Sequence, residues 1–167
     1  MLNGPGPAGA AAADPLGDPR RIFHRLPGTT REAVLEEMAL RMAERGLVPD
    51  ARELWERLID RERLGCTGLG GGVAIPHCKL RALPQIVAAV ASTATPVDFG
   101  ASDHVPIDLI FLVASPADAP AAHLQALARI SRLLRTPGVV EGLRSARSPE
   151  QMADVLRGAA AGLPVTP

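Results

Sequence analysis

Two apolar runs of strand length in the second half of the chain constrain its fold more than any other feature. They are IVAAVAS, residues 86–92, and DLIFLVA, residues 108–114. Prolines flank both runs, and proline interrupts regular backbone hydrogen bonding. Short continuous apolar runs with such boundaries are typical of strands covered on both faces. We therefore expect both runs to be buried strands of one sheet. The flanking prolines are Pro84, Pro96, Pro106 and Pro116.

Helical patterns fill the chain before these runs. Thr29 and Glu32 form a capping-box signature, and apolar residues then recur at helical spacing, which predicts a helix over residues 30–45. Asp50, with a glutamate three residues later, repeats the start signal. A second amphipathic helix is expected from there to about residue 64.

Further helices are expected after the second run. The segment HLQALARISRLL predicts an amphipathic helix over residues 123–134, with His123 in its first turn. Shorter helices are expected over residues 139–144 and 148–156. Alternation of apolar and polar residues also indicates a short strand over residues 22–26.

Length and composition indicate one globular domain. The chain has 167 residues, of which 47% are hydrophobic, and it shows no internal repeat. We expect the domain to span residues 20–157. A disordered tail over residues 1–19 is expected before it, because that segment is rich in alanine, glycine and proline and lacks the basic start of a secretion signal. A flexible tail is expected over residues 158–167.

The charge balance argues against two classes of partner. With 18 basic residues, 18 acidic residues and 2% aromatics, the chain has neither a basic excess nor stacking rings for nucleic acid. No run reaches the roughly 18 apolar residues of a membrane span, so no membrane insertion is expected. Cys66 and Cys78 make no disulfide framework, which indicates reduced thiols and a cytoplasmic location.

The chemistry of the chain concentrates in residues 61–80, RERLGCTGLGGGVAIPHCKL. An arginine fork fits phosphate oxygens, and a glycine-rich loop lets backbone amides turn toward an anion. His77 follows a short apolar strand and a proline, and histidine gains and loses charge near neutral pH. These residue types in this order predict a histidine that works beside a phosphate.

Two other interpretations of this stretch are weaker. Cys66, His77 and Cys78 lack the second pair of a structural zinc site, and neighbours on a strand point apart. The glycine loop lacks the lysine and hydroxyl of a nucleotide-binding P-loop and precedes a strand. We therefore expect no metal and no cofactor.

The motif TGLGGGVAIPHCKL, preceded by DRERLGC and followed by a helix that opens with HLQAL, resembles a known family. It is similar to the enzyme IIA domains of the fructose and mannitol class of the bacterial phosphoenolpyruvate-dependent phosphotransferase system, and most similar to the nitrogen-regulatory branch. The resemblance covers about residues 20–157. It implies an α/β fold with a single domain, in which helices flank a mixed central sheet.

The resemblance also implies roles for individual residues. His77 would accept a phosphoryl group, with the family's arginine at Arg61 and its second active-site histidine at His123. A glycine usually follows the active histidine, where this chain has Cys78, and Gly71 stands where a polar residue is usual. Loop donors are expected to bind the phosphate, and the candidates are Thr67, Gly68, Gly70 and Gly72.

Three functions remain open at this stage. The favoured one is a phosphohistidine carrier that takes phosphate from an HPr-like carrier protein and regulates protein targets in nitrogen or other metabolism. The alternative is a sugar-specific component that passes phosphate to a IIB domain for fructose- or mannitol-type uptake. The third is a binding module in which His77 is never phosphorylated.

Overall fold

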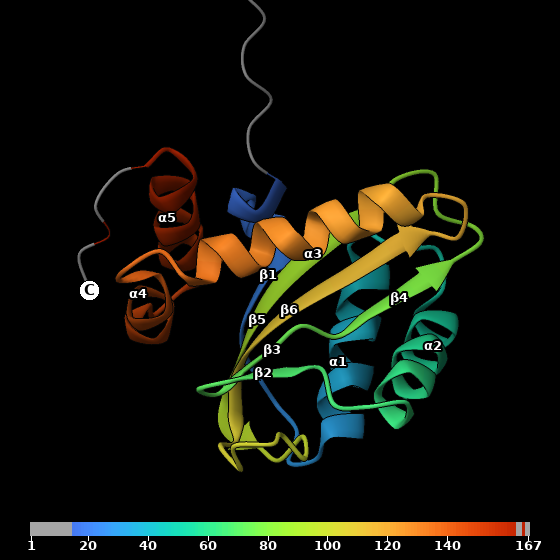
Figure 1. Cartoon of the computed structure of the whole chain (residues 1–167), viewed down its shortest axis with the longest axis horizontal. Coiled ribbons are helices and arrows are strands. Elements are labelled where there is room, and N and C mark those ends of the chain that lie inside the picture. The colour runs from blue at the N-terminus through green and yellow to red at the C-terminus, as the bar shows by residue number, and fades with distance from the viewer. Residues whose placement is uncertain (1–14, 163–164, 166–167) are drawn as a thin grey trace, which may run out of the picture.

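A central sheet with helices on both faces forms the body of the protein (Figure 1). The computed structural model describes residues 15–162 and residue 165. The strands are β1 (Ile22–Leu26), β2 (Gly68–Gly70), β3 (Val73–Ala74), β4 (His77–Leu80), β5 (Val87–Val97) and β6 (Ile107–Pro116). The helices are α1 (Arg31–Glu44), α2 (Ala51–Arg63), α3 (Pro120–Leu134), α4 (Val139–Ser145) and α5 (Pro149–Ala160), preceded by the 3-10 turns η1 (Pro15–Gly17) and η2 (Pro19–Arg21).

The sheet is mixed, as the family resemblance implied. Its strand order is β1-β5-β6-β3-β2, and β4 follows β3 along the same side of β6. The β1–β5, β3–β6 and β4–β6 pairs are parallel, whereas β5–β6 and β2–β3 are antiparallel. Within the described residues β4 pairs with β6 alone, so its other edge is free of strands.

Strand β6 is the centre of both hydrophobic cores. Its residues from Ile107 to Pro116 are buried apart from Asp108, which is partly exposed. Ile110 and Leu112 face one core, and Phe111 and Val113 face the other. Because successive strand residues point to opposite faces, a strand covered on both sides must be apolar throughout. The expectation of buried strands in one sheet is confirmed.

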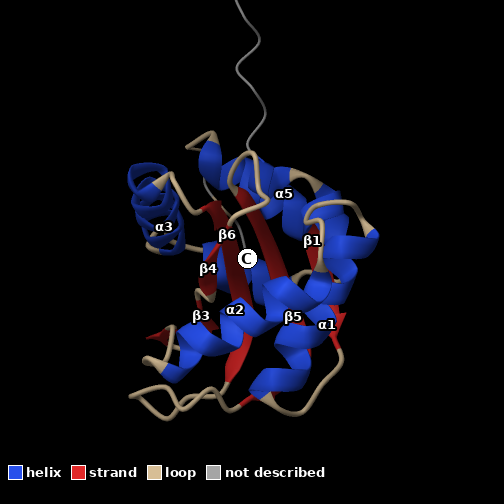
Figure 2. Ribbon diagram, turned by 90° about the vertical axis from the view of Figure 1, so that its right-hand side faces the viewer, coloured by secondary structure: helices blue, strands red, loops and turns tan. Residues whose placement is uncertain are grey.

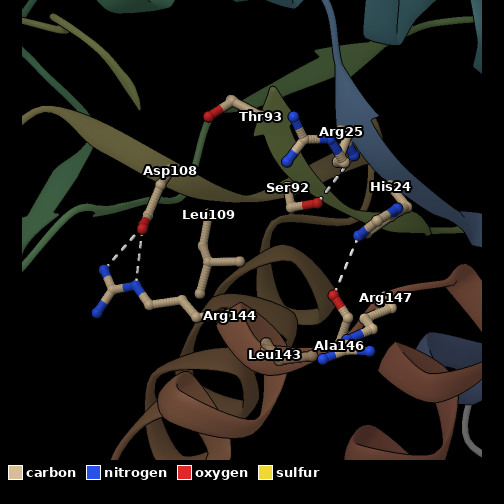
Figure 3. Close-up of a pocket in the computed structure, with 10 residues that line it drawn as sticks. All are labelled: His24, Arg25, Ser92, Thr93, Asp108, Leu109, Leu143, Arg144, Ala146 and Arg147. Carbon is tan, nitrogen blue, oxygen red and sulfur yellow. Dashed lines mark hydrogen bonds and ion pairs between the residues drawn. The ribbon is translucent and has the colours of Figure 1, made fainter. Parts of the chain in front are cut away.

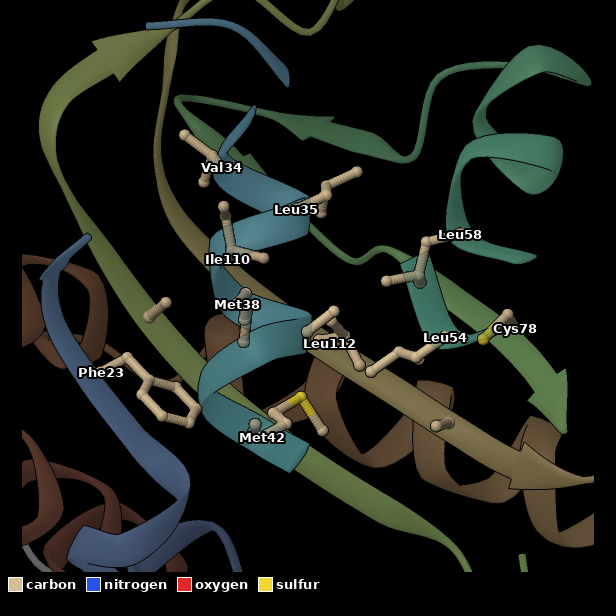
Figure 4. Packing of buried hydrophobic residues seen from close by; sticks show 14 of the residues in the cluster. Phe23, Val34, Leu35, Met38, Met42, Leu54, Leu58, Cys78, Ile110 and Leu112 are labelled. Carbon is tan, nitrogen blue, oxygen red and sulfur yellow. The ribbon is translucent and has the colours of Figure 1, made fainter. Parts of the chain in front are cut away.

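Helices α1 and α2 cover one face of the sheet. Figure 4 shows Val34, Leu35, Met38 and Met42 of α1 on the side of the sheet that carries Ile110 and Leu112. The N-cap of α1 is Thr30, whose hydroxyl accepts a hydrogen bond from the amide of residue 33 at 3.2 Å. The N-cap of α1 therefore lies one residue after Thr29, where the sequence predicted it.

Helices α3, α4 and α5 cover the opposite face. Figure 2 shows α3 and α1 on opposite sides of the strands. Ile130 of α3, Leu143 of α4 and Leu156 of α5 all belong to the second core. The helix that holds His123 is thus separated by the sheet from the helix that holds Arg61.

The ends of the domain differ from the expectation. Residues 15–19 were expected within a disordered tail, but η1 and the start of η2 lie there and Leu16 is buried in the second core. Residues 1–14 of that tail lie outside the described residues, as do 163–164 and 166–167 of the other. Helix α5 continues to Ala160, three residues past the expected boundary. Among the helices of the described residues, none combines the length and apolar character that a membrane crossing requires.

Candidate functional site

His77 is the first residue of β4, at the free edge of the sheet. Its backbone aligns with Val113 of β6, and the carbonyl of Pro76 accepts a hydrogen bond from the Val113 amide at 3.0 Å. The His77 side chain is half-buried, whereas Cys78 beside it is buried in the first core. Strand alternation therefore presents the imidazole outward while its neighbour anchors the strand.

The imidazole of His77 is held in one tautomer. Its Nδ1 lies 2.7 Å from the carbonyl oxygen of Ile75. Because a carbonyl oxygen only accepts, Nδ1 carries the proton and donates it to this hydrogen bond. In the neutral ring the lone pair then resides on Nε2. Nε2 is therefore the ring nitrogen of His77 that has a lone pair available.

Arg61 approaches this same nitrogen from the last turn of α2. Its Nε donates to Nε2 of His77 at 3.3 Å, and its Nη1 donates to the carbonyl of Gly65 at 3.0 Å. The second contact fixes the guanidinium against the end of its own helix. A permanent positive charge is therefore held at the atom of His77 that would receive a phosphoryl group.

His123 reaches the site from the first turn of α3, on the other face of the sheet. Its ring centroid lies 5.3 Å from that of His77, with an angle of 55° between the planes. Burial lowers the pKa of His123, and repulsion between its protonated form and those of His77 and Lys79 lowers it further. His123 is thus a neutral ring at physiological pH.

Ser115, which the sequence analysis did not identify, orients His123. Its fully buried hydroxyl lies 2.6 Å from Nδ1 of His123. Within the described residues the Ser115 hydroxyl has no other hydrogen-bond partner, so we assign its proton to this contact and Nδ1 as the acceptor. The ring proton of neutral His123 then lies on Nε2. The signal was available in the sequence, because Ser115 shares strand parity with Val113 and thus faces the layer that contains α3.

Replacing Ser115 by alanine tests this orientation. Ser115→Ala removes the donor to Nδ1, so His123 is expected to populate both neutral tautomers, and the proposed phosphorylation of His77 is expected to slow roughly fivefold, the worth of one hydrogen bond. Nitrogen-15 chemical shifts of the imidazole report the tautomer. Ser131→Ala, in the same helix as His123, is the control. A single unchanged tautomer in Ser115→Ala would contradict the assignment.

The three predicted side chains share one open pocket. It has a volume of about 410 Å³, and α2, β4 and α3 all contribute to its wall. Arg57, Arg61 and Lys79 line it against a single acid, Asp60, so the pocket carries a net positive charge that favours an anion. The structure therefore brings together His77, Arg61 and His123.

Thr67 lies behind this pocket rather than in it. Its side chain is buried, and both its hydroxyl and its amide donate hydrogen bonds to the carboxylate of Glu62, which is also buried. Glu62 was missed in the sequence, although it follows the buried Leu58 by one helical turn and so shares its face. The Thr67 carbonyl in turn accepts a hydrogen bond from the Ile75 amide at 3.0 Å. This chain of contacts connects α2 to the residue that holds the His77 ring.

The predicted glycine ligands lie in the β2–β3 hairpin, and none of them lines the His77 pocket. At its turn, the amide of Gly71 donates to the carboxylate of Asp103 at 2.8 Å, and Arg144 donates to the Gly71 carbonyl. The structure therefore does not bring Gly68, Gly70 or Gly72 to His77. Their role as phosphate ligands stays a prediction, and these contacts give the turn a structural role.

A matched pair of substitutions tests that structural role. Gly71 and Gly72 both have positive φ, 64° and 83°. A Cβ at Gly72 would meet Arg144 at 2.7 Å and Asp108 at 3.1 Å, whereas nothing lies within 4 Å of one at Gly71. Gly71→Ala is expected to lower the free energy of unfolding by about 1 kcal/mol, and Gly72→Ala by about 2–3 kcal/mol more. Equal losses in chemical denaturation would contradict this contrast.

Metal ligation has little support in the site. Burial raises the pKa of the Cys78 thiol to about 12, so it stays protonated at neutral pH. The Cys66 sulfur accepts a hydrogen bond from the Gly68 amide at 3.2 Å. Within residues 15–162, no group of three or more histidine, cysteine or acidic side chains is arranged to hold a metal ion.

Comparison with known proteins finds the same architecture and similar sequences. The family model described as phosphoenolpyruvate-dependent sugar phosphotransferase system, EIIA 2, matches residues 16–158. The nitrogen regulatory protein of Bradyrhizobium diazoefficiens is 41% identical and that of Pseudomonas aeruginosa 38% identical, each over 83% of this chain and 90% of the relative. The fructose-specific EIIA component of Haloferax volcanii is 35% identical over 78% of this chain and 84% of its own length.

Solved structures agree with these sequence matches. The crystal structure of the nitrogen regulatory protein IIA-Ntr from Neisseria meningitidis has a TM-score of 0.75 at 30% identity and covers 83% of this chain and 94% of that one. The complex of enzyme IIA-mannitol with phosphorylated enzyme IIB-mannitol from Escherichia coli has a TM-score of 0.69 at 22% identity, over 83% of this chain and 95% of that one. The second likeness shows the fold alone.

Proposed function

Because the chain belongs to the family of phosphoenolpyruvate-dependent sugar phosphotransferase system EIIA 2 domains, we propose that it is a phosphohistidine carrier that accepts phosphate on His77. The family resemblance drawn from the sequence is confirmed, including its similarity to nitrogen regulatory proteins. The observation that carries the proposal is the contact of Arg61 with Nε2 of a His77 ring whose Nδ1 proton is already engaged.

The transfer requires one bond to form and one to break. Nε2 of neutral His77 attacks the phosphorus of a phosphohistidine on the donor protein, and the donor's nitrogen–phosphorus bond breaks, leaving its electron pair on the donor ring. The His77 ring retains its Nδ1 proton and becomes positively charged. The Ile75 carbonyl, which accepts that proton's hydrogen bond, stabilises the positive ring.

Arg61 and His123 stabilise the phosphoryl oxygens in this proposal. In the unphosphorylated protein the Nε–H of Arg61 points to the lone pair on Nε2 of His77. As the phosphorus approaches this nitrogen, we expect the Nε–H to turn to an equatorial phosphoryl oxygen. The Nε2–H of His123 supplies a second donor from the opposite layer. Phosphoryl transfer asks a protein mainly for such positioning and charge stabilisation.

The direct test is incubation with phosphoenolpyruvate, enzyme I and an HPr-like carrier protein of verified activity. We expect the intact mass to rise by one phosphoryl group, and we expect that group to be lost in acid, as phosphoramidates are. An unchanged mass with an active carrier would overturn the proposal and favour a binding module.

We propose that the carrier acts mainly as a regulator in the cytoplasm, with its charge state selecting protein targets. The nitrogen regulatory relatives at 38% and 41% identity support this role. The fructose-specific relative at 35% identity supports the second candidate, transfer to a IIB domain for sugar uptake. Mixing the phosphorylated protein with a purified fructose-type IIB domain distinguishes the two functions. Rapid phosphoryl transfer to the IIB domain is expected only for a component of sugar uptake.

Phosphorylation is expected to raise the pKa of His123. In the unphosphorylated protein, repulsion between the protonated forms of His77 and His123 contributes to lowering that pKa. A phosphoryl group brings roughly two negative charges close to His123, and a nearby negative charge favours the imidazolium form. An NMR titration of the His123 ring before and after phosphorylation measures the change. A pKa that falls or stays constant would show that His123 does not contact the phosphoryl group.

A further inference from the structure

A second polar pocket lies on the sheet, separate from the His77 site. It has a volume of about 390 Å³, and residues of β1, β5, β6, α4 and the segment after α4 line it (Figure 3). It shares no lining residue with the His77 pocket. Strand β6 nevertheless adjoins both pockets. Its Leu109 lines the second pocket, and its Val113 pairs with His77 in the first.

Basic side chains dominate this second pocket. Arg25, Arg144 and Arg147 line it, against the single acid Asp108. Arg144 and Asp108 neutralise each other through two hydrogen bonds of 2.8 Å, which Figure 3 shows. In the part of the chain that the structure describes, the side chains of Arg25 and Arg147 have no hydrogen-bond or ion-pair partner. The lining of this pocket therefore includes two exposed arginine side chains without an acidic partner among the described residues.

The polar groups beside these arginines are also fixed in position. The amide of Arg25 donates to the hydroxyl oxygen of Ser92 at 2.9 Å, holding Arg25 at a positive φ of 56°. Such a conformation is costly for a residue other than glycine. Nε2 of His24 lies 3.1 Å from the Ala146 carbonyl, so it donates there and the Nδ1 of the neutral ring is left as an acceptor.

From this arrangement we propose that the pocket binds a small phosphomonoester that carries a hydroxyl group. The dianionic phosphate matches the two uncompensated charges, and the planar guanidinium forks suit its oxygens. His24 Nδ1 accepts a hydrogen bond from the ligand's hydroxyl. The volume is within the range of roughly 300–1,000 Å³ for small-molecule sites. Among the described residues, His24 contributes the one aromatic ring that lines the pocket, which disfavours a nucleotide whose base would stack.

Titration of the full, unphosphorylated chain with glycerol 3-phosphate, followed by amide NMR, tests the proposal. The Arg61→Ala background weakens anion binding at the His77 pocket, because it removes one of the three basic side chains there. We expect saturable shifts at the amides of Arg25, Ser92 and Arg147. Glycerol is expected to cause none, and inorganic phosphate, which lacks the hydroxylated carbon chain, is expected to bind more weakly.

Variants locate the binding. Arg25→Gln and Arg147→Gln are each expected to weaken binding by about tenfold or more, because each removes hydrogen bonds to a charged group. Arg135→Gln, which removes an exposed arginine outside the pocket, is expected to leave it unchanged, and an unaltered amide spectrum elsewhere shows that each variant is folded. Absence of saturable shifts, or equal weakening by Arg135→Gln, would overturn the site. Equal affinity for inorganic phosphate would overturn the hydroxyl requirement.

Discussion

His77→Ala is expected to abolish phosphorylation of the protein completely. The substitution removes the nucleophilic nitrogen itself, and neither Arg61 nor His123 is placed to replace it, since one is a permanent cation and the other has its Nδ1 engaged by Ser115. The half-buried His77 ring lies at the free edge of β4, so its loss should leave the core intact. Intact mass spectrometry after incubation with the upstream components measures the loss.

The matched control for this experiment is His104→Asn. His104 is exposed, and asparagine tolerates the positive φ of 58° at that position. This variant should accept one phosphoryl group as the wild type does. A phosphoryl group that remains in His77→Ala and disappears in His104→Asn would place the acceptor outside the proposed site.

Arg61→Ala is expected to slow phosphoryl transfer by about 100-fold, the usual effect of removing one preorganised charged donor from a transition state. Its guanidinium is the permanent charge that contacts Nε2 of His77, whereas His123 supplies a neutral donor. His123→Ala should therefore slow transfer less than Arg61→Ala. Rapid-quench measurement of the single-turnover rate compares the variants.

Arg57→Ala provides the control for charge alone. Arg57 lies one helical turn before Arg61, lines the same pocket and is exposed, but it makes no hydrogen bond to His77. Its removal should change the transfer rate only slightly. If phosphoryl transfer were equally slow in Arg57→Ala and Arg61→Ala, the net positive charge of the pocket would explain both effects. The specific contact of Arg61 with Nε2 would then not contribute to the rate.

The fold was largely predictable because its signals are local. The apolar runs around Val90 and Phe111 predicted strands covered on both faces, and both runs form such strands. The N-caps of α1 and α2 lie within one residue of the predicted positions. They were predictable because the hydrogen bond from a backbone amide to the capping side chain is a short-range interaction. Boundaries were less predictable, as the buried Leu16 shows, because tertiary packing extends order into a segment with weak intrinsic preference.

The site was predictable only in part. The motif indicated His77, Arg61 and His123, and the structure brings these three together. The glycine loop was expected beside them, but its turn is instead held by Asp103 and Arg144. Loop composition shows that backbone amides are available, whereas only the path of the hairpin decides which group they meet.

The sequence by itself determined the elements, the mixed α/β character implied by its motif and the identity of the candidate phosphate acceptor, because these depend on periodicity, caps and residue chemistry within short stretches. Only the tertiary structure decided that β4 lies at a free sheet edge, where α2 from one layer and α3 from the other both reach His77. It also decided that Glu62 and Ser115 hold Thr67 and His123 in place. The contact between Ser115 and His123 joins β6 to α3, and its geometry exists only once these two elements have packed together.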